Sequence, residues 1–178
     1  ALEERSAAKD SNVTVTSTLP IMTDNVTFTF GGKSETVQLV VVPDDRTGDL
    51  GDYVCLEDES EEPLSLGDGD VYLSKSSQLV LGIPPGDTAQ VQDSSLNVAD
   101  VKVSDISLNY LGNTLYMTQG TYECAFGRSV RLNGIFALLK GSSADQIKFG
   151  ERLKSDGWLT ISCTAEHWEN YEDNFAIV

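Results

Sequence analysis

Residues 26–42, VTFTFGGKSETVQLVVV, carry the clearest structural signal in this chain. Apolar and polar side chains alternate through VTFTF, and both halves are rich in the β-branched and aromatic residues that favour strands. Gly31 and Gly32 separate the halves, and glycine supplies the positive φ that a tight hairpin turn requires. The stretch therefore predicts a β-hairpin.

Similar strand signals recur on the C-terminal side of this hairpin. Short runs rich in strand-forming residues, with turn signals between them, lie at residues 71–73, 78–83, 88–92, 98–110, 114–118, 122–126 and 132–139. Short strands at such regular spacing are typical of a sandwich or barrel. We predict a mainly β fold, a single jelly-roll-like β-sandwich or β-barrel domain.

The longest of these runs changes phase along its length. Val101 and Val103 fall on one face of a strand, whereas Ile106 and Leu108 have the opposite parity. One extra residue near 104–105 would produce such a change. We expect a β-bulge, a bend or a turn between two strands there.

One helix is predicted near residues 143–155. Ser143 and Gln146 have the spacing of a capping box, in which each side chain satisfies an amide of the first turn. Asp145 complements the positive end of the helix dipole, and Arg152 and Lys154 lie near the negative end.

The chain has 178 residues, enough for one hydrophobic core. Residues 1–11 are small and polar, and we interpret them as an N-terminal arm, either flexible or docked on a partner. Residues 12–178 are predicted to form a single β-rich domain. The charged start, Ala1-Leu2-Glu3-Glu4-Arg5, does not resemble a secretory signal, and we expect no membrane insertion.

Charge restricts the classes of partner. The chain has 28 acidic and 12 basic residues, and a formal net charge of −16. A field of this sign repels phosphate backbones and anionic lipids, which excludes nucleic acid as a direct partner. Three explanations remain open: a solubilising surface, adaptation to high salt, and binding of divalent cations.

Calcium is the one ion that the acidic residues suggest, because Ca²⁺ prefers hard oxygen ligands. Apart from this ion we expect no cofactor. The alternative is a set of solvated acidic loops, since the spacing does not match an EF-hand. The candidate ligands lie in two neighbouring loop segments: Asp44, Asp45, Asp49, Asp68 and Asp70.

Catalytic residues are not evident, and we predict that the chain is not an enzyme. His167 is the single histidine, so any catalytic triad with a histidine must use it, and a histidine-rich metal site is excluded. The three cysteines are Cys55, Cys124 and Cys163. An odd number leaves at least one thiol unpaired. We expect buried, reduced cysteines, and one long-range disulfide is the alternative.

In outline the chain resembles virion structural proteins with a jelly-roll-like β-sandwich. The predicted β body, the N-terminal arm and the absence of catalytic residues carry this resemblance. It implies a self-assembling, non-enzymatic capsid, coat, decoration or tail component, made in the host cytoplasm and located in the virion. It further implies a homo-oligomer or a complex with other shell proteins.

Assembly contacts are expected from the termini, because large aromatic residues dominate interface energetics. The alternative function is an extracellular β-sandwich module that binds carbohydrate or protein and is stabilised by calcium. The predicted interface residues lie at the two ends of the chain: Leu2, Arg5, Trp168, Tyr171 and Phe175.

Overall fold

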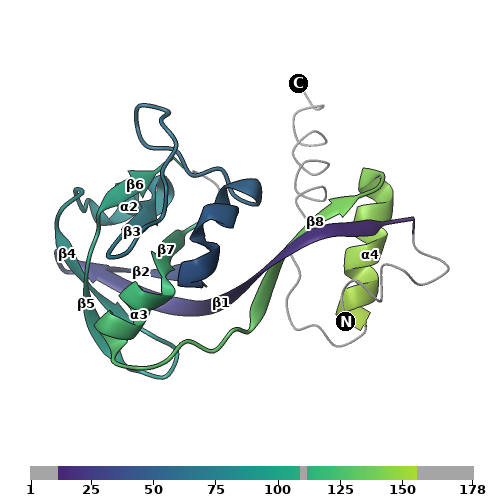
Figure 1. Cartoon of the computed structure of the whole chain (residues 1–178). Coiled ribbons are helices and arrows are strands. Elements are labelled where there is room, and N and C mark those ends of the chain that lie inside the picture. Colours follow the sequence, from purple (N-terminus) through teal and green to yellow (C-terminus); the bar gives the residue numbers. More distant parts are fainter. Residues whose placement is uncertain (1–11, 109–111, 156–178) are drawn as a thin grey trace. The chain divides into compact units, whose positions relative to one another are not determined.

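The computed structural model describes residues 12–108 and 112–155 (Figure 1). In chain order the elements are β1 (Thr14–Phe30), β2 (Lys33–Val42), η1 (Asp44–Asp52), β3 (Val71–Ser74), α2 (Lys75–Leu81), β4 (Thr88–Gln92), β5 (Val98–Lys102), β6 (Asp105–Ser107), β7 (Thr114–Thr118), α3 (Gln119–Phe126), β8 (Gly134–Lys140) and α4 (Ser143–Ser155).

Two compact units make up the chain, and β1 and β8 each contribute to both. The larger unit is Leu19–Phe136, and the smaller one combines Ala1–Thr18 with Ala137–Val178. Each unit is described below by itself. The predicted N-terminal arm and the single domain over 12–178 include residues outside the described ranges, and both stay predictions.

A curled, open sheet of mixed direction forms the larger unit, with strand order β5-β4-β1-β2-β7-β3-β6 and β8 paired with β1 (Figure 1). The pairs β2–β7 and β3–β6 are parallel, and the other pairs along this order are antiparallel. The mainly β prediction is confirmed. The predicted jelly-roll-like sandwich or barrel is wrong, because parallel neighbours need crossover connections, and these contain η1, α2 and further strands.

Both faces of this sheet are buried. On β2, Val37, Leu39 and Val41 belong to the larger core, whereas Val40 and Val42 belong to a second core on the opposite face. This split follows directly from the two-residue side-chain period of a strand. The larger core lies between the sheet and helices α2 and α3, and the second core includes residues of η1 and of the loop that follows it.

The predicted hairpin is confirmed as β1 and β2. Phe30 pairs with Lys33, and Gly31 and Gly32 have φ of +56° and +80°. The phase change is confirmed as a break between β5 and β6, which lie at opposite ends of the sheet order. Across the break the Ser104 amide donates to the Val71 carbonyl oxygen at 2.8 Å.

Two helices replace predicted strands. Residues 78–83 were predicted as a strand but lie mostly in α2, and residues 122–126 lie in α3. Each helix begins immediately after a strand and ends at a glycine in the left-handed region, Gly82 (φ +74°) or Gly127 (φ +64°). Glycine ends helices in this way because it lacks the Cβ that disfavours this conformation.

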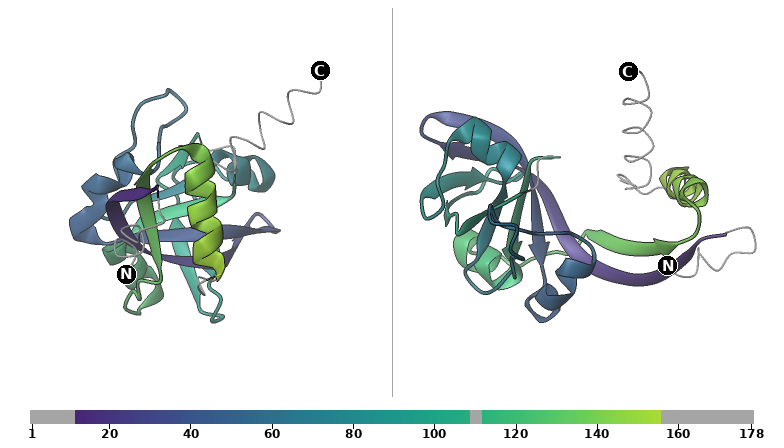
Figure 2. Two further views of the ribbon diagram at one scale, coloured as in Figure 1. Left: turned by 90° about the vertical axis from the view of Figure 1, so that its right-hand side faces the viewer. Right: turned by 90° about the horizontal axis from the view of Figure 1, so that it is seen from above.

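In the smaller unit, α4 packs on the ribbon formed by the ends of β1 and β8 (Figure 2). Its core contains Val13, Phe149 and Leu153. The predicted helix bounds are confirmed, but the capping residue is Ser142 rather than Ser143. The Ser142 hydroxyl accepts from the Asp145 amide at 3.2 Å and donates to its carboxylate at 2.7 Å.

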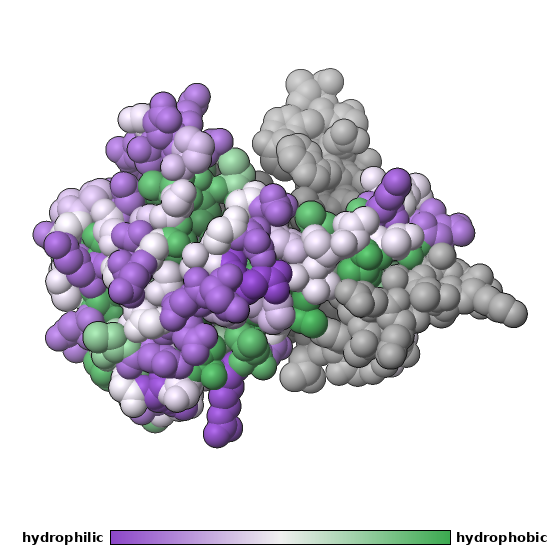
Figure 3. All heavy atoms as spheres, viewed as in Figure 1, coloured by the Kyte–Doolittle hydropathy of each residue, from purple (hydrophilic) through white to green (hydrophobic). Residues whose placement is uncertain are grey.

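No helix within residues 12–108 and 112–155 is both long enough and apolar enough to cross a lipid bilayer. On the face drawn in Figure 3, hydrophilic side chains are spread over the described surface, with residues of intermediate hydropathy and hydrophobic residues between them. This agrees with the excess of acidic over basic residues in the sequence.

Candidate functional site

The turn between β4 and β5 has an unusual residue at its tip. The Leu96 amide donates to the Asp93 carbonyl oxygen at 3.0 Å, and the Asp93 amide donates to the Asn97 carbonyl oxygen at 2.9 Å. This is the pattern of a three-residue hairpin loop, whose last residue adopts the left-handed conformation and is usually glycine. Here that residue is Leu96, with φ +66°.

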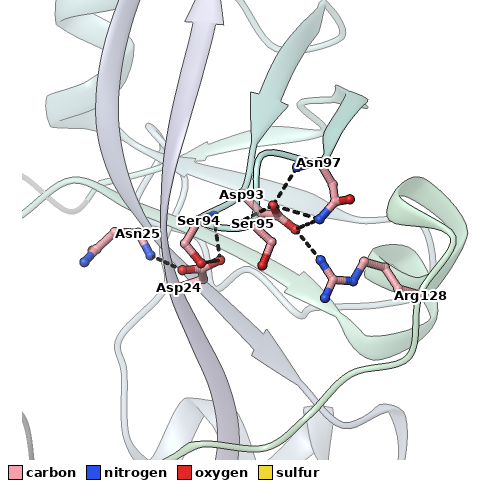
Figure 4. Close-up of polar contacts among 7 residues, drawn as sticks. All are labelled: Asp24, Asn25, Asp93, Ser94, Ser95, Asn97 and Arg128. Carbon is pink, nitrogen blue, oxygen red and sulfur yellow. Dashed lines mark hydrogen bonds and ion pairs between the residues drawn. The ribbon is translucent and has the colours of Figure 1, made fainter.

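Buried Asp93 holds the backbone of this turn (Figure 4). Its Oδ1 accepts from the amides of Ser95 (2.9 Å) and Asn97 (2.8 Å), and both of its oxygens accept from Asn97 Nδ2. Its Oδ2 also pairs with Arg128 Nη1 at 2.8 Å. Asp93 is only 4 % exposed, so the carboxylate depends on these donors in place of water.

The pKa of Asp93 reflects two opposing effects. Burial acts to raise the pKa, because it disfavours the charged form. The hydrogen bonds from Asn97 and Ser95, together with the charge of Arg128, outweigh burial, and the pKa lies below its ordinary value. The carboxylate is therefore ionised whenever the turn is formed near neutral pH.

A second carboxylate anchors the same turn to β1. Asp24 Oδ2 accepts from the Ser94 amide at 3.1 Å and from the Ser94 hydroxyl at 2.9 Å. Next to Asp24 on β1, the Thr23 backbone pairs with the Asn133 side chain. The Thr23 amide donates to Asn133 Oδ1 at 2.7 Å, and Asn133 Nδ2 donates to the Thr23 carbonyl oxygen at 2.9 Å. The turn is therefore held by Asp93 from within and by Asp24 from β1.

A polar hollow of about 160 Å³ adjoins the turn. Two arginines, Arg128 and Arg131, contribute to its wall although the chain as a whole is strongly acidic. Arg131 is exposed and has no ion-pair partner among residues 12–108 and 112–155. The remaining lining residues are Met22, Thr23, Asp24, Asp93, Ser94, Ser95, Tyr122, Ser129 and Asn133.

Leu96 projects from this rigid turn into solvent. It is 75 % exposed, the largest exposed fraction of any large apolar side chain in the described part of the chain. Val98, two residues further along, is 49 % exposed. The turn therefore exposes two apolar side chains, and neither of them lines the hollow.

The predicted calcium ligands are only partly brought together. Asp44 and Asp68 lie near the start of α3, where Asp44 Oδ1 accepts from the Gly120 amide at 2.9 Å. A Cβ added to Gly120 would lie 3.3 Å from Asp44 Oδ2 and 3.6 Å from Asp68 Oδ1. Both carboxylates thus complement the positive end of a helix dipole, which accounts for their position without a metal ion.

The other predicted ligands have separate partners or lie apart. Asp70 Oδ2 accepts from the Gly67 amide at 2.9 Å and from the Tyr72 hydroxyl at 3.1 Å, and burial together with this carboxylate raises the pKa of Tyr72. Asp49 pairs with Arg46, and Asp45 follows Asp44 in η1. No group of three metal-ligating side chains occurs in residues 12–108 and 112–155, and calcium binding stays a prediction.

Two cysteines, Cys55 and Cys124, are free thiols and exposed, so the expectation of buried cysteines is wrong for both. Cys55 borders a second hollow of about 340 Å³, between η1 and residues 54–66. Its thiol donates to Glu57 Oε1 at 3.2 Å, and this hydrogen bond raises the pKa of the thiol.

The predicted interface residues Leu2, Arg5, Trp168, Tyr171 and Phe175 all lie outside the described residues. His167 and Cys163 also fall in that part of the chain. Their proposed roles stay predictions.

Sequence reasoning missed the turn because its polar contacts join distant segments. Arg128 is 35 residues from Asp93, and Ser94 is 70 residues from Asp24. The available signal was the loop Asp93-Ser-Ser-Leu-Asn97 between two strands, where leucine stands at a position that normally requires glycine.

Comparisons with known proteins show a similarity of fold for this chain but do not assign it to a family. No family model matches the chain, and no curated protein matches its sequence. Among solved structures, the fold is similar to the extracellular domain of the noncanonic ABC-type transporter YknZ from Gram-positive bacteria. The TM-score is 0.50 at 15 % identity, over 87 % of this chain and 81 % of that one, so the similarity concerns the fold.

This similarity corrects the predicted function. The virion structural protein inferred from the resemblance is wrong, because the chain shares the fold of a transporter's extracellular domain. The error followed from the mistaken topology: short alternating strands were assigned to a sandwich, whereas they form a curled mixed sheet.

Proposed function

We propose that this chain is an extracellular domain of a membrane transporter of the ABC type, and that it acts there through binding rather than catalysis. The observation that carries the proposal is the fold shared with the YknZ domain over most of both chains. Because fold similarity at this identity does not by itself transfer function, location is the property to test first.

Protease treatment of intact cells tests this proposal. Cells that make the full-length protein are treated with proteinase K, and the protein is followed with an antibody raised against residues 12–155. We expect the full-length band to disappear while a cytoplasmic marker remains intact. Survival of the band until the cells are lysed would contradict an extracellular location.

Membrane attachment is tested on the same cells by washing isolated membranes with alkaline carbonate. A protein that is part of a transporter stays with the membranes. Release into the wash would show that the chain is not part of an integral membrane protein. This outcome would refute the transporter proposal even if the chain is extracellular.

A further inference from the structure

We propose that the hollow between η1 and residues 54–66 binds a small amphipathic cation, a molecule with an apolar chain or ring and one ammonium group. This inference does not depend on whether the chain belongs to a transporter. It rests on the apolar floor of the hollow, on the hydrogen bonds that fix its wall and on the charge at its rim.

The floor of the hollow is part of the second core. Leu50, Leu56 and Leu66 are buried, and Val54 and Leu64 pack against the same core while remaining partly exposed. All five line the hollow. Its volume of about 340 Å³ falls at the lower end of the range for small-molecule pockets, roughly 300–1,000 Å³. A small apolar body would replace water over these side chains, which is favourable.

Hydrogen bonds hold the wall formed by residues 54–66 in place. The Leu64 amide donates to the Leu56 carbonyl oxygen at 2.8 Å, which joins the two sides of this segment. The Tyr72 hydroxyl donates to the Ser65 carbonyl oxygen at 2.8 Å and so ties the segment to β3. A hollow that is formed in advance loses little conformational entropy when a ligand fills it.

Two glycines of η1, Gly48 and Gly51, also line the hollow. Neither has a φ in the left-handed region, so the backbone does not require glycine at either position. A Cβ added to either would meet no atom within 4 Å, so packing does not require glycine there. The effect of the two glycines is to leave space beside the apolar floor.

Charge favours a cation in this hollow. Glu57 is the one charged residue of the lining, which contains no lysine, arginine or histidine. Its Oε1 accepts from the Cys55 thiol, and no cationic side chain of the described residues forms an ion pair with it. A carboxylate offers about four acceptor sites, so Glu57 can also accept from an ammonium group. The net charge of −16 attracts cations as well, which favours an amphipathic cation over a fatty acid.

Protection of Cys55 tests the proposal, because this exposed thiol lines the hollow. The full chain is treated with N-ethylmaleimide, and labelling of Cys55 and Cys124 is followed separately by mass spectrometry of peptides. Cys124 is an exposed thiol on α3 that does not line the hollow, so it serves as the internal control. We expect about 10 mM octylammonium to slow labelling of Cys55 about fivefold or more and to leave Cys124 unchanged.

Two matched probes separate the apolar part of the ligand from its charge. Octanoate has a chain of the same length with the opposite charge, and methylammonium has the same charged group without the chain. We expect neither to slow labelling of Cys55 at the same concentration. Equal protection by octanoate would show that charge plays no part, and equal protection by methylammonium would show a general attraction of cations to the acidic surface. Either result would overturn the proposal.

Substitutions in the lining locate the site. Gly51→Leu should fill the hollow and abolish protection by octylammonium while thermal unfolding stays cooperative. Glu57→Gln should weaken protection about threefold or more, because it removes the charge that faces the ammonium group. The control Glu62→Gln removes the same charge from the same loop but outside the lining, and should leave protection unchanged. Each variant is compared with its own labelling rate without ligand, because Glu57 contacts the Cys55 thiol.

Three further outcomes would overturn the proposal. They are the absence of protection at Cys55 in the wild type, equal slowing of labelling at Cys124, and equal loss of protection in Glu57→Gln and Glu62→Gln. If Gly51→Leu does not fold, the comparison of the two glutamate variants still decides the outcome.

Discussion

At the scale of single residues, Asp93 is the group on which the β4–β5 turn most depends. It is buried, yet it remains charged because Arg128, Asn97 and the Ser95 amide surround it. The sequence shows that Asp93 is polar and lies in a loop. It does not show that Arg128, which follows α3 in the chain, pairs with Asp93 in the fold. This is why the fold, and not the local sequence, defines the site.

Replacing Asp93 tests its structural role. We expect Asp93→Asn to lower the free energy of unfolding by about 2 kcal/mol, because it removes the buried charge that pairs with the half-exposed Arg128 and weakens the acceptors of the turn. The control Asp24→Asn affects a more exposed carboxylate and should lower it by less than about 1 kcal/mol. Urea unfolding followed by fluorescence measures both. Equal effects of the two substitutions would contradict the assigned role.

Stability should also depend on pH through Asp93. Its pKa in the folded chain is depressed, so its contribution is fully present above the unfolded pKa of about 3.9 and is lost as the pH falls through the folded pKa. The difference in unfolding free energy between the wild type and Asp93→Asn should therefore be constant above about pH 5 and shrink below about pH 4. A constant difference down to pH 2.5 would show that Asp93 does not titrate in this way.

At the scale of elements, the sequence predicts best those whose signals are local. The β1–β2 hairpin depends on Gly31 and Gly32, and α4 has charged residues at its ends that complement the helix dipole, so both could be predicted, although Ser142 and not Ser143 caps the helix. Helices α2 and α3 could not, because each is short and begins directly at the end of a strand, at Ser74 or Thr118. A strand pattern in the sequence therefore extends into the residues of the helix. Parallel pairing of β2 with β7 has no local signal at all.

The start of α3 provides a test at this scale. The Thr118 hydroxyl caps the helix by accepting from the Thr121 amide at 3.2 Å. We expect Thr118→Ala to lower the free energy of unfolding by about 1 kcal/mol, and Thr118→Ser, which keeps the oxygen, to recover most of this loss. Thermal unfolding of the three proteins measures the effect. Equal loss in both variants would attribute it to packing of the threonine methyl group.

At the scale of the whole molecule, the acidic surface sets the response to salt. Self-repulsion from a net charge of −16 destabilises the compact state, and salt screens it. We expect the melting temperature to rise by several degrees between about 0.05 M and 1 M NaCl, where the Debye length falls to about 3 Å. Differential scanning calorimetry tests this, and a fall in melting temperature would contradict it.

The transporter proposal, which rests on the fold similarity, requires that the chain faces the outside of the cell. Labelling of Cys124, an exposed free thiol on α3, tests this premise most directly. A full-length protein in which Cys124 is the only cysteine of this chain is treated with a membrane-impermeant maleimide on intact cells, with Cys124→Ser as the blank. The proposal predicts equal labelling before and after permeabilisation. Labelling that appears only after permeabilisation would contradict it.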